Sequence, residues 1–105
     1  MTGIELIAAE RERQISVEGW TAEHDDKHNN RQLVRAAACY ADPTYETVEF
    51  EMRDTPYRWP WEPSWWKPDR DPIRNLVKAG ALIAAEIDRM QRASTAEYLA
   101  ERKAQ

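Results

Sequence analysis

The sequence predicts a mainly α-helical fold, organised as one domain over residues 1–105. A chain of 105 residues that is 42% hydrophobic and 32% charged has enough apolar side chains for a single core and too many for a disordered chain. Two long segments repeat their apolar residues with the period of a helix and begin with capping residues. Only residues 47–53 alternate like a strand, so at most one short β-hairpin is expected.

A first helix is predicted from Thr2 to about Val17. Thr2 and Glu5 have the spacing of a capping box, in which a hydroxyl and a carboxylate satisfy the free amides of a helix start. Gly19 is a natural terminator, because glycine adopts the left-handed conformation that closes a helix. The stripe predicted to face the core contains Ile4, Ile7, Ala8, Arg11 and Ile15. The neighbouring stripe contains Glu10, Gln14 and Glu18.

Residues 19–30 have no apolar period and are rich in Asp, Asn and His, which predicts an ordered loop. Asn30 is placed to cap a second helix from Arg31 to about Ala41, whose small residues let another helix approach closely. Cys39 is the only cysteine and lies in the apolar run of this helix. This placement favours a buried structural thiol in a reducing cytoplasm.

Residues 42–71 are predicted to be an insertion of loop and strand. Repeated prolines in residues 55–68 forbid both regular helix and central strand there. Four of the five tryptophans belong to this stretch: Trp59, Trp61, Trp65 and Trp66. The stretch is too aromatic for a solvated linker, so we expect it to fold back over the helices. Most of these tryptophans should be core residues, with one at most stacking on a base.

The strongest helix is predicted from Ile73 to about Ala93, after a cap at Asp71 and a proline at the first helical position, Pro72. Its predicted buried residues are Ile73, Leu76, Val77, Ile83, Ala84, Ile87 and Met90. An adjoining row contains Asn75, Lys78, Leu82, Glu86 and Arg89. A second capping box, formed by Ser94 and Glu97, predicts a separate tail helix within residues 94–105.

The charge balance argues against nucleic acid as a partner. The net charge is −4, and no cluster of Lys and Arg is dense enough to neutralise a row of phosphates. No stretch approaches the roughly 18 uncharged residues that cross a bilayer, and no targeting signal is found. We therefore expect a cytoplasmic protein without a membrane partner. A nucleotide chelated by a metal ion is still possible, since a cation bridges acidic side chains to phosphate oxygens.

The densest polar cluster lies between the first two predicted helices. Its members are Glu18, Glu23, His24, Asp25, Asp26 and His28. Oxygen ligands of this kind suit Mg²⁺ or Mn²⁺, which keep several waters for exchange with phosphate. The alternative is a solvated loop whose polar residues form turns and cap a helix. Spacing alone does not decide between the two.

Lys78 and Glu86 lie on one row of the predicted long helix, together with Asn75. A lysine on a partly buried face can hold a phosphate, and a glutamate can hold a metal ion. The alternative is that both side chains reach solvent, with Lys78 extending past Leu82. The two interpretations carry equal weight at this point.

Taken together, several strings resemble the phage and prophage dATP/dGTP pyrophosphohydrolases of the MazG-like, all-α NTP pyrophosphatase superfamily. They are IAAERERQ at 7–14, EGWTAEHDDKH at 18–28, AAACYA at 36–41, WPW at 59–61, WWKP at 65–68 and NLVKAGALIAAEIDR at 75–89. The resemblance extends from about residue 4 to residue 90. It implies a MazG-like helical bundle that hydrolyses dGTP or dATP to the monophosphate and pyrophosphate with Mg²⁺ or Mn²⁺. It also implies a homodimer or homotetramer.

The residues and the resemblance together predict a set of site residues. The predicted metal ligands are Glu10, Asp25, Asp26 and Glu86. Lys78 is predicted to contact a phosphate, and His24 or His28 to order a water or contact a phosphate. Further substrate contacts are predicted at Gln14, Asn75 and Trp20.

A different function is suggested by departures from the superfamily signatures. Arg31 and Gln32 stand where a glutamate is expected, and Arg89 follows Glu86 by three residues. The alternative is a non-catalytic phage accessory protein that binds a host protein through its Trp-rich segment. Burial of the four tryptophans in the free chain would remove that proposed surface.

Overall fold

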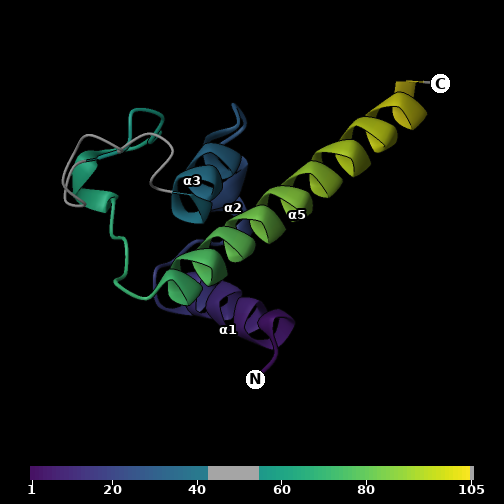
Figure 1. Cartoon of the computed structure of the whole chain (residues 1–105). Coiled ribbons are helices and arrows are strands. Elements are labelled where there is room, and N and C mark those ends of the chain that lie inside the picture. Colours follow the sequence, from purple (N-terminus) through teal and green to yellow (C-terminus); the bar gives the residue numbers. More distant parts are fainter. Residues whose placement is uncertain (43–54, 105) are drawn as a thin grey trace.

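The computed structural model describes residues 1–42 and 55–104, and over these residues the fold is all-α. Its elements are α1 (Gly3–Ser16), α2 (Ala22–Asp26), α3 (Gln32–Ala41), the 3₁₀ turn η1 (Pro63–Trp65) and α5 (Pro72–Ala104). The long α5 is the scaffold, with α1, α2 and α3 all packed on its N-terminal two thirds (Figure 1). The strand predicted at 47–53 lies outside the described residues.

The start of α1 confirms the predicted capping box. The Thr2 hydroxyl accepts a hydrogen bond from the Glu5 amide, and the Glu5 carboxylate accepts one from the Thr2 amide. The helix ends at Ser16, and Gly19 has a φ of 76°, the conformation for which glycine was expected there.

The predicted inward face of α1 is wrong at three of its five residues. Ile4, Ala8 and Ile15 are exposed, whereas Glu10 and Gln14 are the buried residues of this helix. Ile7 and Arg11 of the predicted stripe are half-buried, and Ile7 lies against Gly80 of α5.

The segment between α1 and α3, predicted to be an ordered loop, contains a short helix. Residues 22–26 form the short helix α2, whose start is capped by the Thr21 hydroxyl accepting from the His24 amide. The prediction that Asn30 caps the next helix is also wrong, because α3 begins after Arg31, which has a left-handed φ of 65°. Asn30 instead donates its amide hydrogen to the Gln32 side chain.

The core lies between α3, α5 and the Trp-rich segment. The small residues of α3 let it lie closely against α5, as expected, and Cys39 is buried. Trp59 and Trp66 join this core, which confirms that the segment folds back over the helices. The core residues are Leu33, Ala36, Ala37, Cys39, Tyr40, Trp59, Trp66, Ala79, Leu82 and Ala85.

α5 begins as predicted, with the Asp71 carboxylate accepting from the Ile73 amide and Pro72 in the first position. The predicted break at Ser94 is wrong, since α5 continues to Ala104. No glycine or proline follows Gly80, and the residues after Ser94 include the good helix formers Ala, Glu, Leu, Arg and Lys. A capping box without a helix breaker before it does not interrupt the helix.

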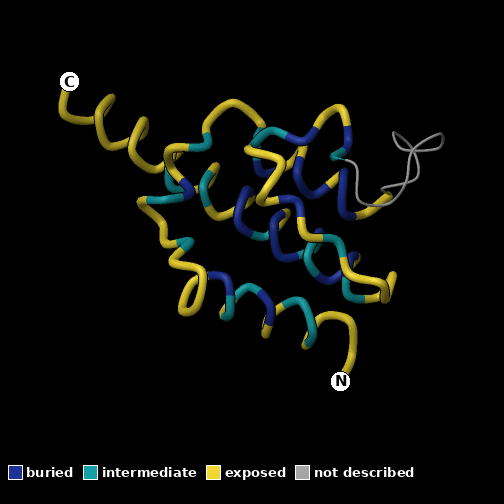
Figure 2. The backbone as a smooth tube through the Cα atoms, turned by 90° about the vertical axis from the view of Figure 1, so that its left-hand side faces the viewer, coloured by how far each residue is buried: buried dark blue, intermediate teal, exposed yellow. Residues whose placement is uncertain are grey.

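The inward face of α5 also differs from the prediction. Val77 is buried, but Ile73, Leu76, Ile83, Ile87 and Met90 are exposed and Ala84 is half-buried. The adjoining row faces the core instead: Asn75, Leu82 and Glu86 are buried, and Lys78 and Arg89 are half-buried (Figure 2). Among the described helices, none combines the length and the apolar character that a membrane crossing needs.

Candidate functional site

An aromatic cavity of about 660 Å³ lies between α2 and the Trp-rich segment. Its walls are Trp20, His24, His28, Trp59, Pro60, Trp61, Glu62, Pro63 and Trp65. Three predicted site residues, Trp20, His24 and His28, therefore face tryptophans from a distant part of the chain. The volume is in the range of pockets that hold a small organic molecule.

Four aromatic rings of this cavity form a cluster in which each ring contacts two of the others. Trp20 and His24 are parallel, with an interplanar angle of 2° and centroids 5.8 Å apart. His24 meets His28 edge-on at 4.8 Å, and His28 meets Trp61 edge-on at 5.1 Å. The centroids of the Trp61 and Trp20 rings lie 6.3 Å apart. Such an arrangement offers several ring faces and edges to a flat aromatic ligand.

The rings that line the cavity contain three polar groups, of which those of His24 and His28 are the ones available to orient such a ligand. His24 Nδ1 lies 3.1 Å from Asp25 Oδ1, so its other ring nitrogen is not engaged by that contact. Trp61 Nε1 is buried and has no hydrogen-bond partner among the described residues. Burial, followed by the charge of His24, lowers the pKa of His28. A neutral His28 ring can both donate and accept a hydrogen bond.

The lowered pKa of His28 predicts a pH dependence of stability. An unfolded chain binds the His28 proton near its ordinary pKa of about 6.5, whereas the folded chain binds it at a lower pH. The stability that His28 contributes is therefore fully present above its unfolded pKa of about 6.5. It is lost as the pH falls from there through the lower pKa of the folded chain. We expect His28→Phe, which keeps a ring but removes the titration, to lose less stability than the wild type between about pH 7.5 and 5.5. Chemical unfolding at the two pH values measures this, and identical losses would contradict it.

A polar crevice of about 50 Å³ adjoins the aromatic cavity. The two share Trp20 and Trp65 as walls. The crevice is lined by Glu10, Arg13, Gln14, Glu18, Trp20, Tyr40, Trp65, Lys67, Lys78 and Leu82. Three predicted site residues, Glu10, Gln14 and Lys78, thus come together here from α1 and α5. Its volume is enough for an ion or a few waters.

Arginines hold the two carboxylates of the crevice. Arg13 donates to Glu10 at 2.6 Å and to Glu18 at 2.8 Å, so one guanidinium bridges both. Arg74 also binds Glu10. Burial by itself raises the pKa of Glu10, but hydrogen bonds and charge from Arg13 and Arg74 outweigh it and leave the pKa below the ordinary value. Glu10 is consequently a carboxylate anion at neutral pH.

Lys78 and Gln14 supply the other polar groups of the crevice. Lys78 donates to the Lys67 carbonyl at 2.7 Å and lies 5.4 Å from the centre of the Tyr40 ring. Burial, followed by the charge of Arg74, lowers the pKa of Lys78. Gln14 is 2% exposed, and its Oε1 has no hydrogen-bond partner among the described residues. A buried acceptor of this kind favours a bound donor, cation or water.

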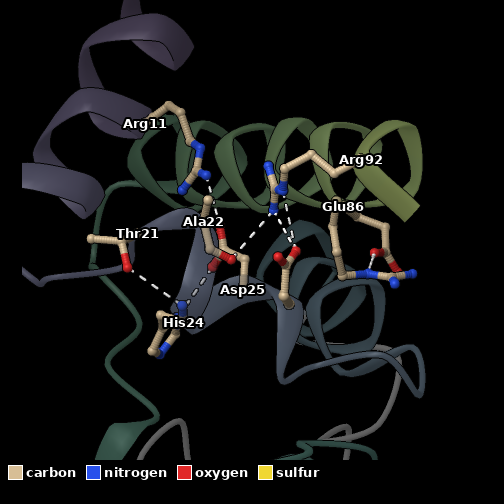
Figure 3. A network of polar contacts seen from close by, with 9 residues as sticks. Arg11, Thr21, Ala22, His24, Asp25, Glu86 and Arg92 are labelled. Atoms are coloured by element: carbon tan, nitrogen blue, oxygen red, sulfur yellow. Dashed lines mark hydrogen bonds and ion pairs between the residues drawn. The ribbon is translucent and has the colours of Figure 1, made fainter. Parts of the chain in front are cut away.

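The other predicted metal ligands lie outside the crevice, each bound to an arginine (Figure 3). Arg11 reaches from α1 to the buried Asp25. Asp26 is exposed and binds Arg92 of α5. The buried Glu86 binds Arg89. Within residues 1–42 and 55–104, no three acidic, histidine or cysteine side chains are grouped so as to hold a metal ion. The structure therefore does not bring the four predicted carboxylates together within one chain.

Asn75 was predicted to contact substrate, but its side chain forms hydrogen bonds with the backbone of the same chain. Its Oδ1 accepts from the Asp69 amide and its Nδ2 donates to the Asp69 carbonyl. Both halves of the side-chain amide are thereby used to fix the turn before α5.

The site also contains residues that the sequence reasoning did not single out. Arg13, Lys67 and Glu62 line the two cavities. Arg13 could have been found, because it is three residues after Glu10 on the same helix. Lys67 and Glu62 belong to the irregular Trp-rich segment, where no periodic pattern indicates the direction in which a side chain points. Comparisons with protein-family models, with curated proteins and with solved structures find no match to this chain.

Proposed function

We propose that this chain cleaves a purine deoxynucleoside triphosphate, dGTP or dATP, into the monophosphate and pyrophosphate, with Mg²⁺ or Mn²⁺ as cofactor. One observation supports the proposal above all others. An aromatic cavity and a charged crevice meet at Trp20 and Trp65. A nucleotide has the same two parts, a flat apolar base joined to a charged phosphate chain.

The aromatic cavity suits the base. Stacking on an aromatic side chain is worth roughly 1 to 3 kcal/mol per base. The His28 ring, which lines the cavity, offers a hydrogen-bond donor and an acceptor to the base edge. His24 and His28 are therefore assigned here to the base rather than to the attacking water.

The crevice suits the phosphates and their cation. Arg13, Lys67 and Lys78 supply positive charge around a volume too small for a phosphate chain, which would lie at its mouth. Glu10, Glu18 and the unpartnered Gln14 Oε1 are hard oxygen donors, the type that Mg²⁺ takes beside substrate phosphates. These three residues would hold a divalent ion only after the Arg13 side chain, 39% exposed, swings away and Arg74 also releases Glu10. When bound, such an ion polarises phosphate oxygens and lowers the pKa of a bound water.

Protein binding through an exposed tryptophan surface is not favoured. Trp59 and Trp66 are buried, Trp61 is half-buried, and Trp65 is 50% exposed. A single exposed tryptophan does not form the tryptophan surface that this alternative needs.

The direct test incubates the purified 105-residue chain with each of the four dNTPs and either Mg²⁺ or Mn²⁺. We expect dNMP and pyrophosphate from dGTP or dATP, in preference to the pyrimidines, and no dNDP. Glu10→Gln should abolish turnover, whereas Glu12→Gln, an exposed glutamate of the same helix, should retain it. Absence of purine nucleotide hydrolysis with both ions would overturn the proposal.

Replacing Trp61 with leucine should weaken nucleotide binding. Loss of one stacking ring corresponds to roughly a 5- to 150-fold rise in KM, with a smaller effect on kcat. The control is Tyr98→Leu, an exposed aromatic residue near the C-terminal end of α5. Deoxyguanosine or deoxyadenosine, which carry no phosphate, should inhibit the wild type and lose potency by the same factor in Trp61→Leu. Equal kinetics in the two variants would contradict a base site in the aromatic cavity.

A further inference from the structure

Guanidinium groups already hold both carboxylates of the polar crevice in the free protein. Arg13 donates from Nε and Nη2 to the two oxygens of Glu10, at 2.6 and 3.1 Å, and from Nη1 to Glu18 at 2.8 Å. Arg74 donates to Oε1 of Glu10 from the first turn of α5. Arg13 and Arg74 are called the guanidinium latch below, because together they cover the oxygens that a metal ion would use.

The crevice, as far as the described residues form it, carries more positive than negative charge. Its carboxylates are Glu10 and Glu18, and the cationic side chains around them are Arg13, Lys67, Lys78 and Arg74. A cleft with an excess of one charge concentrates ligands of the opposite sign and repels those of its own. A divalent cation that arrives alone is therefore repelled, whereas a polyanion is attracted.

A divalent ion that arrives alone also finds too few oxygens open to it. Glu10 is 1% exposed, so an ion reaches this carboxylate only by displacing both arginines. That displacement leaves two guanidinium charges without their partner, which is costly. Gln14 Oε1 has no partner among the described residues, but one neutral oxygen does not replace the carboxylates that Mg²⁺ takes. We therefore expect the closed latch to exclude the bare ion.

A phosphate chain supplies the partners that the latch loses on opening. The side chains of Arg13 and Arg74 are 39% and 34% exposed, so both reach solvent from their present positions. A guanidinium binds phosphate oxygens through two parallel hydrogen bonds, as it binds a carboxylate. A ligand shifts an equilibrium only toward the state that it binds better. A phosphate chain binds the open latch better than the closed one.

We propose that a phosphate chain opens the guanidinium latch, and that the protein takes up its divalent ion only together with those phosphates. This inference rests on the proposed function for its ligand, a triphosphate that arrives with a chelated cation. Mg²⁺ in such sites is usually bound by one or two carboxylates together with substrate phosphates. Glu10 and Glu18, once released, are two such carboxylates. The latch thus selects the metal–nucleotide complex over the free metal ion.

The test titrates the 105-residue protein separately with MnCl₂ and with metal-free inorganic tripolyphosphate, by calorimetry. We expect the wild type to bind tripolyphosphate more tightly than Mn²⁺. Arg13→Gln removes three of the four hydrogen bonds of the latch. It should bind Mn²⁺ about tenfold or more tightly than the wild type. It should bind tripolyphosphate about 10- to 100-fold more weakly.

Opposite changes in the two affinities are the signature of the latch, because a loss of folding would weaken both. Arg35→Gln, an exposed arginine of α3, is the matched control and should change neither affinity. Arg74→Gln guards against misfolding of the first variant and should shift both affinities in the same directions by less. Circular dichroism checks that all variants remain helical.

Two results would overturn the latch: Mn²⁺ binding as tight in the wild type as in both latch variants, or no tripolyphosphate binding by the wild type. Either result together with dNTP hydrolysis would leave the proposed function standing. Opposite affinity changes in a protein that hydrolyses no dNTP would support the latch and end the proposed function.

Discussion

Replacing Asp25 with alanine is expected to lower the free energy of unfolding by about 3 to 5 kcal/mol. The Asp25 carboxylate is fully buried and accepts a hydrogen bond from Arg11 at 2.7 Å. Nε and Nη1 of Arg11 already have no partner among the described residues. Without Asp25 the guanidinium would remain buried with an uncompensated charge, which is the costly way to break an ion pair. Denaturant unfolding monitored by circular dichroism measures the loss.

The neighbouring Asp26 provides the matched control. Its side chain is 52% exposed and binds Arg92, which is itself 35% exposed. Solvent screens such a pair, so Asp26→Ala should cost less than about 1 kcal/mol. Arg11→Met together with Asp25→Leu should recover part of the stability lost in Asp25→Ala, because both charges are then removed. Equal losses for Asp25→Ala and Asp26→Ala would show that burial does not set the cost.

Helix starts could be predicted where a single turn of sequence determines them. The capping box of Thr2 and Glu5 and the cap at Asp71 both depend on neighbours within three residues. The similar signal at Ser94 failed, since a helix already in progress continues unless a breaking residue stops it. α2 was missed because its turn residues also form a short helix once Thr21 caps it.

The inward faces of the helices could not be predicted in the same way. Periodicity identifies an apolar stripe, but one chain does not reveal whether that stripe meets its own core or another molecule. On α5 the core side is built from Ala79, Leu82 and Ala85, which allow close approach, and from the paired Glu86. Most of the larger apolar residues of α5, apart from Leu82 and Val77, lie outside the core.

The candidate site was predictable only where its residues lie on regular helices. Glu10, Gln14 and Lys78 lie on polar stripes of two amphipathic helices, and those stripes face each other. Adjacent aspartates in α2, however, point about 100° apart on the helix, so Asp25 turns inward and Asp26 outward. The meeting of α2 with the tryptophans depends on the path of an irregular segment, which no periodic pattern encodes.

Replacing Lys78 with methionine is expected to lower kcat/KM for the purine dNTP by about 100- to 1000-fold, the usual cost of removing one preorganised donor from developing negative charge. Methionine keeps the length of the stem and removes the cationic end, which lies over the Tyr40 ring and donates to the Lys67 carbonyl. Lys103→Met, on the exposed end of the same helix, should retain wild-type kinetics. Steady-state assays of released pyrophosphate measure the effect, with unfolding curves to verify that both variants are folded.

The pH profile separates a phosphate contact from a structural role for Lys78. Burial lowers the pKa of Lys78, so the ammonium loses its proton at a lower pH than an exposed lysine, for which the pKa is about 10.4. We expect KM to rise on the alkaline side as that proton is lost. Lys78→Arg keeps its charge at such pH values, and its KM should therefore stay flat where the wild-type value climbs. Parallel profiles for the two proteins would remove Lys78 from the phosphate site, because a purely structural lysine has no reason to link substrate affinity to its own proton.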